Sequence, residues 1–224
     1  MKKRFLIAFG LLAMLCSAQE NHKYDSDIAT IKKYDNIYEP AQNPILFVGS
    51  SSIRKWGHLQ EAFGNYNVIN RGIGGAVTDD ITHYVDDLVF KYKPRQIVLY
   101  VGENDLPDNT KTDDIILQKT ISLYTAIRAK LPEVPIVYIA MKPSPLRDNY
   151  QQKCKAANDK IRKFLSTEKN AVFVDVYTPM LANGKSRPEL FVEDMLHMNA
   201  KGYSIWEEAV APYLLKEETA KKKM

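Results

Sequence analysis

Five short apolar runs, separated by longer amphipathic stretches, set the strongest constraint on how this chain can fold. The apolar runs cover residues 45–49, 67–70, 96–101, 136–140 and 172–175. The amphipathic stretches cover residues 53–63, 79–92, 112–131, 150–166 and 200–214. Short runs that are apolar throughout are typical of strands buried on both faces, and their alternation with helices is typical of a parallel sheet. We therefore predict an α/β fold in which helices cover both faces of one parallel sheet.

We expect one folded domain, at residues 41–216 of the 224-residue chain. No repeat or Gly/Ser-rich linker divides it, and a hydrophobic content of 45% is enough for a packed core without metals or disulfides. Residues 19–40 are polar and rich in tyrosine, and we predict an N-terminal extension with one helix packed over the sheet. Residues 217–224 form a basic tail that we expect to be solvated.

The first eighteen residues have the pattern of a secretory signal peptide. Basic residues at 2–4 precede an apolar stretch at 5–15, and small residues lead up to Ala18. The pattern predicts cleavage after Ala18 and a secreted or periplasmic protein that keeps no membrane span. An uncleaved anchor is the alternative, although a membrane helix needs roughly 20 apolar residues.

Charge and cysteine content exclude several classes of protein. Residues 1–18 carry three of the 31 basic residues and none of the 27 acidic ones, so their removal lowers the formal net charge from +4 to +1. No basic stripe then indicates a nucleic-acid partner. Cys16 leaves with the same segment, and Cys154 has no partner for an intrachain disulfide. We interpret Cys154 as structural.

Four short motifs carry the polar chemistry of the chain: GSSS at 49–52, GIGG at 72–75, GEND at 102–105 and DMLH at 194–197. The first three each follow a predicted strand. The carboxyl ends of parallel strands lie along one edge of a sheet, so we expect these motifs to meet in one crevice. The fourth motif precedes the last predicted helix and can fold back to the same edge. The connecting loops are short, which predicts an open, shallow cleft.

The motifs supply the groups that acyl transfer to a serine requires. Ser51 stands at a turn from a strand into a helix and can act as a nucleophile; a simple helix cap is the alternative role of residues 50–52. Gly75 can offer an unobstructed backbone N–H to an oxyanion, and Asn104 can offer its side-chain amide. Ordinary turn formation is the alternative for both.

Asp194 and His197 can supply the base. They are three residues apart, so a single helical turn would place them on one face. The carboxylate could then accept a hydrogen bond from one ring nitrogen and leave the other free to take the serine proton. A surface histidine beside a carboxylate is the alternative. The other three histidines have no carboxylate at a matching distance in a similar loop.

Signatures of other hydrolases are absent from the sequence. No G-x-S-x-G motif indicates an α/β-hydrolase, no H-E-x-x-H or paired C-x-x-C indicates zinc, and no P-loop or G-x-G-x-x-G motif indicates a nucleotide. We therefore predict no metal and no cofactor. A metal-dependent phosphoesterase that uses Asp105, Asp194 and His197 is the weakest alternative.

The four motifs together resemble those of the SGNH/GDSL hydrolases, and the resemblance extends over residues 45–215. It implies a three-layer α/β/α sandwich around a five-stranded parallel sheet, of flavodoxin-like type, with no metal. It also implies that Ser51, Asp194 and His197 form the catalytic triad. The oxyanion hole would consist of the backbone N–H of Ser51, the N–H of Gly75 and the side chain of Asn104.

One position departs from the family pattern. Ser50 replaces the Asp of the Gly-Asp-Ser block. That Asp is not one of the proton-transfer residues, so the replacement is compatible with catalysis. It raises the question of how the loop around Ser51 is braced.

The resemblance is nearest to the branch of platelet-activating-factor acetylhydrolase subunits and carbohydrate O-acetylesterases. We therefore expect a secreted serine ester hydrolase that removes short acyl groups, acetyl in particular, from a carbohydrate or other small ester. A lipid-directed lipase or lysophospholipase and a non-catalytic glycan-binding protein on this fold are the alternatives. Arg147, in the loop after the fourth strand, is a candidate substrate contact or part of a plain loop. The sequence indicates no particular oligomeric state.

Overall fold

A five-stranded parallel sheet forms the centre of the molecule in the computed structural model, which describes residues 22–216. The strands are β1 (Ile45–Gly49), β2 (Val68–Gly72), β3 (Gln96–Tyr100), β4 (Ile136–Ile139) and β5 (Ala171–Val174). Their order in the sheet is β2-β1-β3-β4-β5, and every neighbouring pair is parallel. The five predicted strands are confirmed. All residues of β1 and β3 are buried, which explains why these runs are almost entirely apolar.

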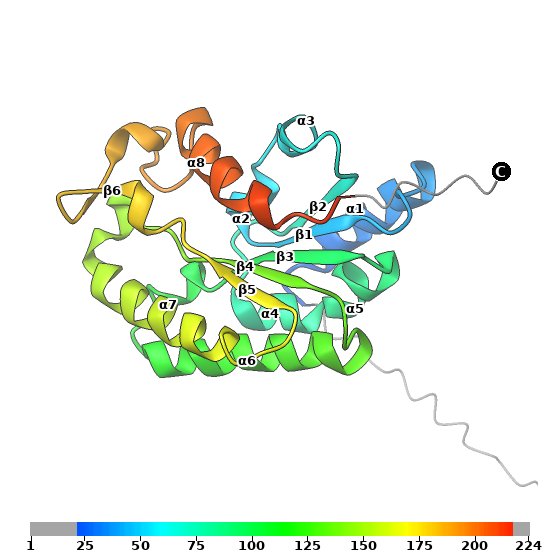
Figure 1. The fold of residues 1–224 in the computed structure, drawn as a ribbon, viewed down its shortest axis with the longest axis horizontal. Helices are drawn as coiled ribbons and strands as arrows, with labels where there is room; N and C mark the ends of the chain where they lie inside the picture. The colour runs from blue at the N-terminus through cyan, green and yellow to red at the C-terminus, as the bar shows by residue number, and fades with distance from the viewer. Residues whose placement is uncertain (1–21, 217–224) are drawn as a thin grey trace, which may run out of the picture.

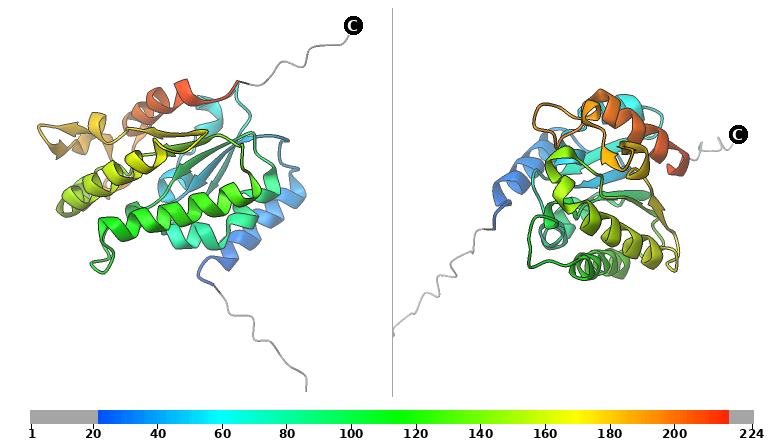
Figure 2. Two further views of the ribbon diagram at one scale, coloured as in Figure 1. Left: turned by 60° about the horizontal axis from the view of Figure 1, so that its bottom comes forward. Right: turned by 90° about the vertical axis from the view of Figure 1, so that its left-hand side faces the viewer.

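Helices cover both faces of the sheet and complete three layers (Figure 1). One face carries α2 (Ser51–Arg54), α3 (Leu59–Ala62) and α8 (Ala200–Val210). The other face carries α4 (Thr78–His83), α5 (Val85–Leu88), α6 (Asp113–Lys130) and α7 (Gln151–Leu165). The long helices α6 and α7 run side by side across this second face (Figure 2). The predicted α/β/α sandwich is confirmed.

Two of the predicted helices are interrupted. The stretch 53–63 forms the separate short helices α2 and α3 because the chain bends to bury Trp56. The Trp56 ring packs edge-on against Phe47 of β1 and Trp206 of α8, with centroid distances of 5.7 Å in both cases. The stretch 79–92 divides into α4, α5 and the 3₁₀ turn η1 (Phe90–Tyr92). In the stretch 53–63, the packing of Trp56 overrides a continuous helical pattern.

The other three predicted helices are confirmed. Helix α6 begins after Thr112, whose hydroxyl accepts a hydrogen bond from the backbone N–H of Ile115. Helix α8 begins after Asn199, whose side chain accepts from two backbone N–H groups of the first turn. It gives way to the 3₁₀ turn η6 (Ala211–Tyr213), where Pro212 has no N–H to continue the α-helical ladder.

Several short elements were not predicted from the sequence. An antiparallel hairpin is formed by β6 (Leu181–Ala182) and β7 (Lys185–Ser186). The remaining 3₁₀ turns are η2 (Glu103–Asp105), η3 (Pro145–Tyr150), η4 (Thr178–Met180) and η5 (Pro188–Leu190). These elements are too short to leave a periodic hydrophobic pattern, and they lie in the loops that surround the carboxyl edge of the sheet.

The predicted N-terminal extension contains one helix, α1 (Asp25–Ile37). It packs beside α4 and α5, where Tyr84 donates to Asp25 at 2.8 Å and Lys32 pairs with Asp87 at 2.8 Å. The predicted signal peptide at 1–18 and the basic tail at 217–224 lie outside the described residues. Within residues 22–216, no helix is both long enough and apolar enough to cross a membrane.

We predict that Gly49→Ala destabilises the fold by roughly 2–4 kcal/mol. Gly49 ends β1 with φ +152°, and an added Cβ would lie 1.9 Å from the carbonyl oxygen of Tyr100 on β3. Urea unfolding measures the change. Gly57→Ala is the matched control because its Cβ would meet no atom within 4 Å, and we expect it to shift stability by less than about 0.5 kcal/mol. Equal effects of the two substitutions would contradict the packing argument.

Candidate active site

The ends of three neighbouring strands lie level with one another. Gly49 of β1 pairs with Gly72 of β2 on one side and with Tyr100 of β3 on the other. Beyond the strands, the N–H of Ile73 donates to the carbonyl of Gly49 at 2.8 Å, and the N–H of Ser50 donates to the carbonyl of Tyr100 at 3.0 Å. The first three polar motifs therefore leave the sheet side by side, as predicted from the parallel topology.

Ser51 is the first residue of α2, directly after β1. The loop around it is braced by the backbone and not by the side chain of Ser50, which makes no capping hydrogen bond. Instead the carbonyl of Ser50 accepts from the N–H groups of Ile53 and Arg54. Tyr203 of α8 adds a further tie by donating to the carbonyl of Ser52 at 2.9 Å. These bonds hold the loop without the Asp that the family pattern has at position 50.

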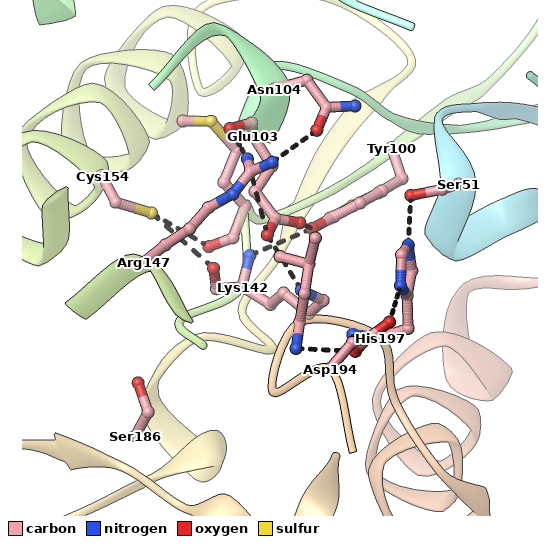
Figure 3. A network of polar contacts seen from close by, with 12 residues as sticks. Ser51, Tyr100, Glu103, Asn104, Lys142, Arg147, Cys154, Ser186, Asp194 and His197 are labelled. Atoms are coloured by element: carbon pink, nitrogen blue, oxygen red, sulfur yellow. Dashed lines mark hydrogen bonds and ion pairs between the residues drawn. The ribbon is translucent and has the colours of Figure 1, made fainter. Parts of the chain in front are cut away.

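His197 lies opposite Ser51, although 146 positions separate them in sequence. Its Nε2 is 2.9 Å from Ser51 Oγ, and its Nδ1 is 2.6 Å from Asp194 Oδ2 (Figure 3). The His197 side chain is 16% exposed, and that of Asp194 is 42% exposed. With the Nδ1 proton donated to Asp194, Nε2 is left as an acceptor that faces the serine hydroxyl. The structure thus brings together the three residues that the sequence suggested as nucleophile, base and orienting carboxylate.

The prediction that one helical turn holds Asp194 and His197 is wrong. The segment is a tight turn in which Val192 donates its N–H to the carbonyl of His197 at 2.9 Å, next to a bridge between Phe191 and Met198. Met195 has the left-handed φ of +54°, which no α-helix allows. Asp194 nevertheless reaches the His197 ring, because the turn folds its carboxylate back toward Nδ1.

Three hydrogen bonds fix the Asp194 carboxylate. Besides the His197 ring, it accepts from the backbone N–H of Leu196 at 2.9 Å and of His197 at 2.8 Å. Partial burial raises the pKa of Asp194, but the hydrogen bonds from His197 and from these backbone groups outweigh it and hold the pKa well below its usual range. The carboxylate therefore stays ionised and can stabilise an imidazolium at position 197.

Three N–H donors in the loops after β1, β2 and β3 are candidates to bind a developing oxyanion. Among the described residues, neither the N–H of Ser51 nor that of Gly75 donates to a protein acceptor. Gly75 has φ +76°, a conformation that glycine adopts without a Cβ penalty. Asn104 Nδ2 donates to the carbonyl of Ala76 at 3.0 Å, which places the amide beside the Gly75 loop and leaves its second N–H unused. The arrangement has the elements of an oxyanion hole.

Three basic side chains near the site make contacts that the sequence did not indicate. Lys142 is buried and pairs with buried Glu103 at 2.9 Å, whereas a lysine in a loop after a strand is expected to be exposed. Lys55 Nζ lies 3.3 Å from His197 Nδ1. Arg147, the candidate substrate contact, has its guanidinium on Asn104 and on the carbonyl of Glu103. No periodicity or motif marks such pairings in advance.

Residues 22–216 contain no group of three or more His, Cys, Asp or Glu side chains arranged to hold a metal ion. Asp105, which the weakest sequence alternative grouped with Asp194 and His197, is fully buried. Its carboxylate accepts from the N–H and hydroxyl of Thr78 and from Lys111 Nζ at 2.8 Å. Asp105 therefore ties the loop after β2 to the loop after β3.

A serine, a histidine and an aspartate lie in hydrogen-bonded order at the carboxyl edge of a three-layer α/β/α sandwich, an arrangement found in hydrolases that pass an acyl group through the serine. The sequence matches the GDSL-like lipase/acylhydrolase family over residues 47–205, and the chain belongs to that family. A search of curated proteins finds no match to it.

Solved structures share the fold at low sequence identity. A candidate platelet activating factor from Streptococcus pneumonia is 24% identical to this chain, with a TM-score of 0.74. The superposition covers 86% of this chain and 94% of the other. A GDSL-like lipase from Bacteroides thetaiotaomicron is 21% identical, with 84% and 98% covered and a TM-score of 0.69. An acetylxylan esterase from Geobacillus stearothermophilus, solved as a catalytic mutant, is 16% identical, with 79% and 96% covered and a TM-score of 0.61.

We predict that Asp194→Asn lowers kcat by about 10³-fold or more, because an amide no longer selects the ring tautomer that leaves Nε2 unprotonated. Hydrolysis of an aryl acetate measures the effect. Asp175→Asn is the matched control. Like Asp194, Asp175 accepts hydrogen bonds from the backbone N–H groups two and three residues later, those of Tyr177 and Thr178, but it has no histidine partner. The assignment of Asp194 would be contradicted if both substitutions lowered kcat equally.

Proposed function

We propose that the protein hydrolyses esters in two steps through an acyl-enzyme on Ser51. The hydrogen-bonded line from Ser51 Oγ to His197 Nε2 and from His197 Nδ1 to Asp194 carries this proposal. His197 takes the proton of Ser51 as the oxygen attacks the ester carbonyl, and it returns that proton to the departing alcohol. The same ring then activates a water, which releases the acid and restores the serine.

The negative charge that forms on the carbonyl oxygen in both steps needs donors. The N–H groups of Ser51 and Gly75 and the amide of Asn104 meet this need in our proposal. Each such donor is worth about 3–4 kcal/mol in activation free energy, so together they account for a large part of the rate.

We propose an acetyl or similarly short acyl group on a carbohydrate as the substrate. The exposure of the turn at 191–198 supports a bulky alcohol, since the Asp194 side chain is 42% exposed and also borders a shallow hollow lined by Phe191, Val192, Glu193 and Asn199. Structures of the same fold include an acetyl esterase and acetylxylan esterases, which supports a short acyl group. Export through residues 1–18 belongs to the same proposal, because an exported esterase would meet the carbohydrates that lie outside the cell membrane.

A lipid ester is the second candidate, and one observation favours it. Leu146, Val192 and Met195 are 59%, 42% and 40% exposed, and the N–H of Leu146 donates to the carbonyl of Met195 at 3.0 Å. An exposed apolar rim of this kind suits an acyl chain or a lipid surface better than it suits a sugar.

We predict that Ser51→Ala abolishes hydrolysis of 4-nitrophenyl acetate, with a loss of about 10⁵-fold or more in kcat, because no nucleophile remains. Ser50→Ala is the matched control, since the Ser50 side chain makes no capping bond, and we expect it to keep kcat within about threefold. Activity that survives in Ser51→Ala would overturn the serine mechanism. A wild-type protein without turnover on any ester would support the non-catalytic alternative.

We predict that kcat/KM falls at least about tenfold from 4-nitrophenyl acetate to the octanoate, because a short-acyl site has no room for the longer chain. Acetylated xylo-oligosaccharides should be deacetylated by the same preparation. A rise in kcat/KM with chain length, together with inactivity on the oligosaccharides, would contradict the carbohydrate proposal and support a lipid substrate. The Ser51→Ala protein serves as the blank for both assays.

A further inference from the structure

Arg147 occupies a kink in η3, next to the active site but outside the triad and the oxyanion hole. Its backbone has φ −117° and ψ 18°, which interrupts the 3₁₀ geometry of the segment. The side chain is only 13% exposed. Nη2 donates to Asn104 Oδ1 at 2.7 Å, and Nη1 donates to the backbone carbonyl of Glu103 (Figure 3).

This contact determines which way the Asn104 amide points. A guanidinium can only donate, so the oxygen of Asn104 must face Arg147, and the carbonyl of Ala76 can only accept, so Nδ2 must face Ala76. Figure 3 shows the amide oxygen turned to Arg147 and the nitrogen turned away from it. If the amide were flipped, its nitrogen would face the Arg147 guanidinium and its oxygen would face the carbonyl of Ala76. Neither pair can form a hydrogen bond, so both bonds would be lost.

We propose that Arg147 is a positioning residue of the oxyanion hole: it holds the Asn104 amide with its N–H toward the reacting carbonyl oxygen and strengthens that N–H as a donor. The inference rests on the proposed function. A cation bonded to an amide oxygen draws electron density from the nitrogen, and hydrogen bonds in such a chain reinforce one another. Arg147 therefore acts on the transition state through Asn104 and need not touch the substrate.

Buried charges below Arg147 keep its guanidinium directed at Asn104. Lys142 Nζ pairs with one oxygen of Glu103 at 2.9 Å, and the Tyr100 hydroxyl donates to the other oxygen. Burial lowers the pKa of Lys142, and the Glu103 carboxylate opposes that effect. Burial and the same carboxylate raise the pKa of Tyr100 well above its usual range, so its hydroxyl remains a donor. Arg147 Nη1 lies 3.8 Å from the same carboxylate, and this ion pair holds the guanidinium next to the loop that carries Asn104 while Nη2 bonds to the Asn104 amide.

The segment that carries Arg147 is anchored on both sides. Asp148 accepts from Ser186 of the β6–β7 hairpin at 2.5 Å and from Gln151 at the start of α7 at 2.7 Å. Leu146 donates its N–H to Met195 in the turn between Asp194 and His197 at 3.0 Å. The η3 segment therefore bonds both to Asn104 and to the turn that carries Asp194 and His197. The β6–β7 hairpin helps to hold η3 in place through Ser186.

A double-mutant cycle on kcat for 4-nitrophenyl acetate tests the inference, with Arg147→Met, Asn104→Ala and the double variant. We expect Arg147→Met to lower kcat about 10- to 100-fold with KM changed less than about threefold, and Asn104→Ala to lower it about 10²- to 10³-fold. The double variant should be no slower than Asn104→Ala alone, because Arg147 has nothing left to position.

Two further variants separate positioning from general stability. Arg128→Met is the matched control, since the Arg128 guanidinium also donates to backbone carbonyls, those of Leu131, Val134, Lys169 and Asn170, but at a distance from the site. It should lower Tm and leave kcat unchanged. Arg147→Lys keeps the charge and one hydrogen bond, so we expect it to recover part of the kcat lost in Arg147→Met, and it replaces that variant in the cycle if Arg147→Met does not fold.

Losses in kcat that multiply in the double variant would overturn the positioning role of Arg147 and leave the serine mechanism standing. A loss that appears only in KM would have the same consequence and would return Arg147 to the role of a substrate contact. Activity that survives in Ser51→Ala would overturn the proposed function and this inference together.

Discussion

The level register of β1 with both of its neighbours is the constraint on which the site depends. Gly49, Gly72 and Tyr100 end their strands side by side, and two backbone hydrogen bonds continue this alignment into the loops. A slip of one residue in either pairing would turn the following motif to the other face of the sheet. The glycine at position 49 makes the alignment possible, because the backbone of β3 approaches too closely for any side chain there.

Two loop segments add the groups that the sheet itself does not supply. The turn at 191–198 carries both His197 and the Asp194 carboxylate that is bonded to its ring. Hydrogen bonds within the turn fix the two side chains relative to each other. The η3 segment bonds to this turn through Leu146 and to Asn104 through Arg147. The turn that carries Asp194 and His197 is therefore linked to Asn104 by protein contacts through η3.

The strands, the layers and the meeting of the polar motifs could be predicted because each follows from local patterns and from parallel topology. The strands β1, β3 and β4 are almost entirely apolar since both of their faces are covered, whereas the edge strand β2 ends in polar residues. The polar motifs follow the strands in order. The break between α2 and α3 could not be predicted, since it depends on where Trp56 packs. The same holds for the left-handed Met195, for the burial of Lys142 against Glu103 and for the partner of Arg147. Each of these depends on contacts between residues far apart in sequence.

A crystal structure of the protein after reaction with a small fluorophosphonate would test the proposed roles of Ser51, Gly75 and Asn104, because the tetrahedral phosphorus adduct mimics the transition state of acyl transfer. We expect phosphorus bonded to Ser51 Oγ, with one phosphoryl oxygen about 3 Å from the N–H nitrogens of Ser51 and Gly75 and from Asn104 Nδ2. An adduct on another residue, or a phosphoryl oxygen turned away from these three donors, would contradict it.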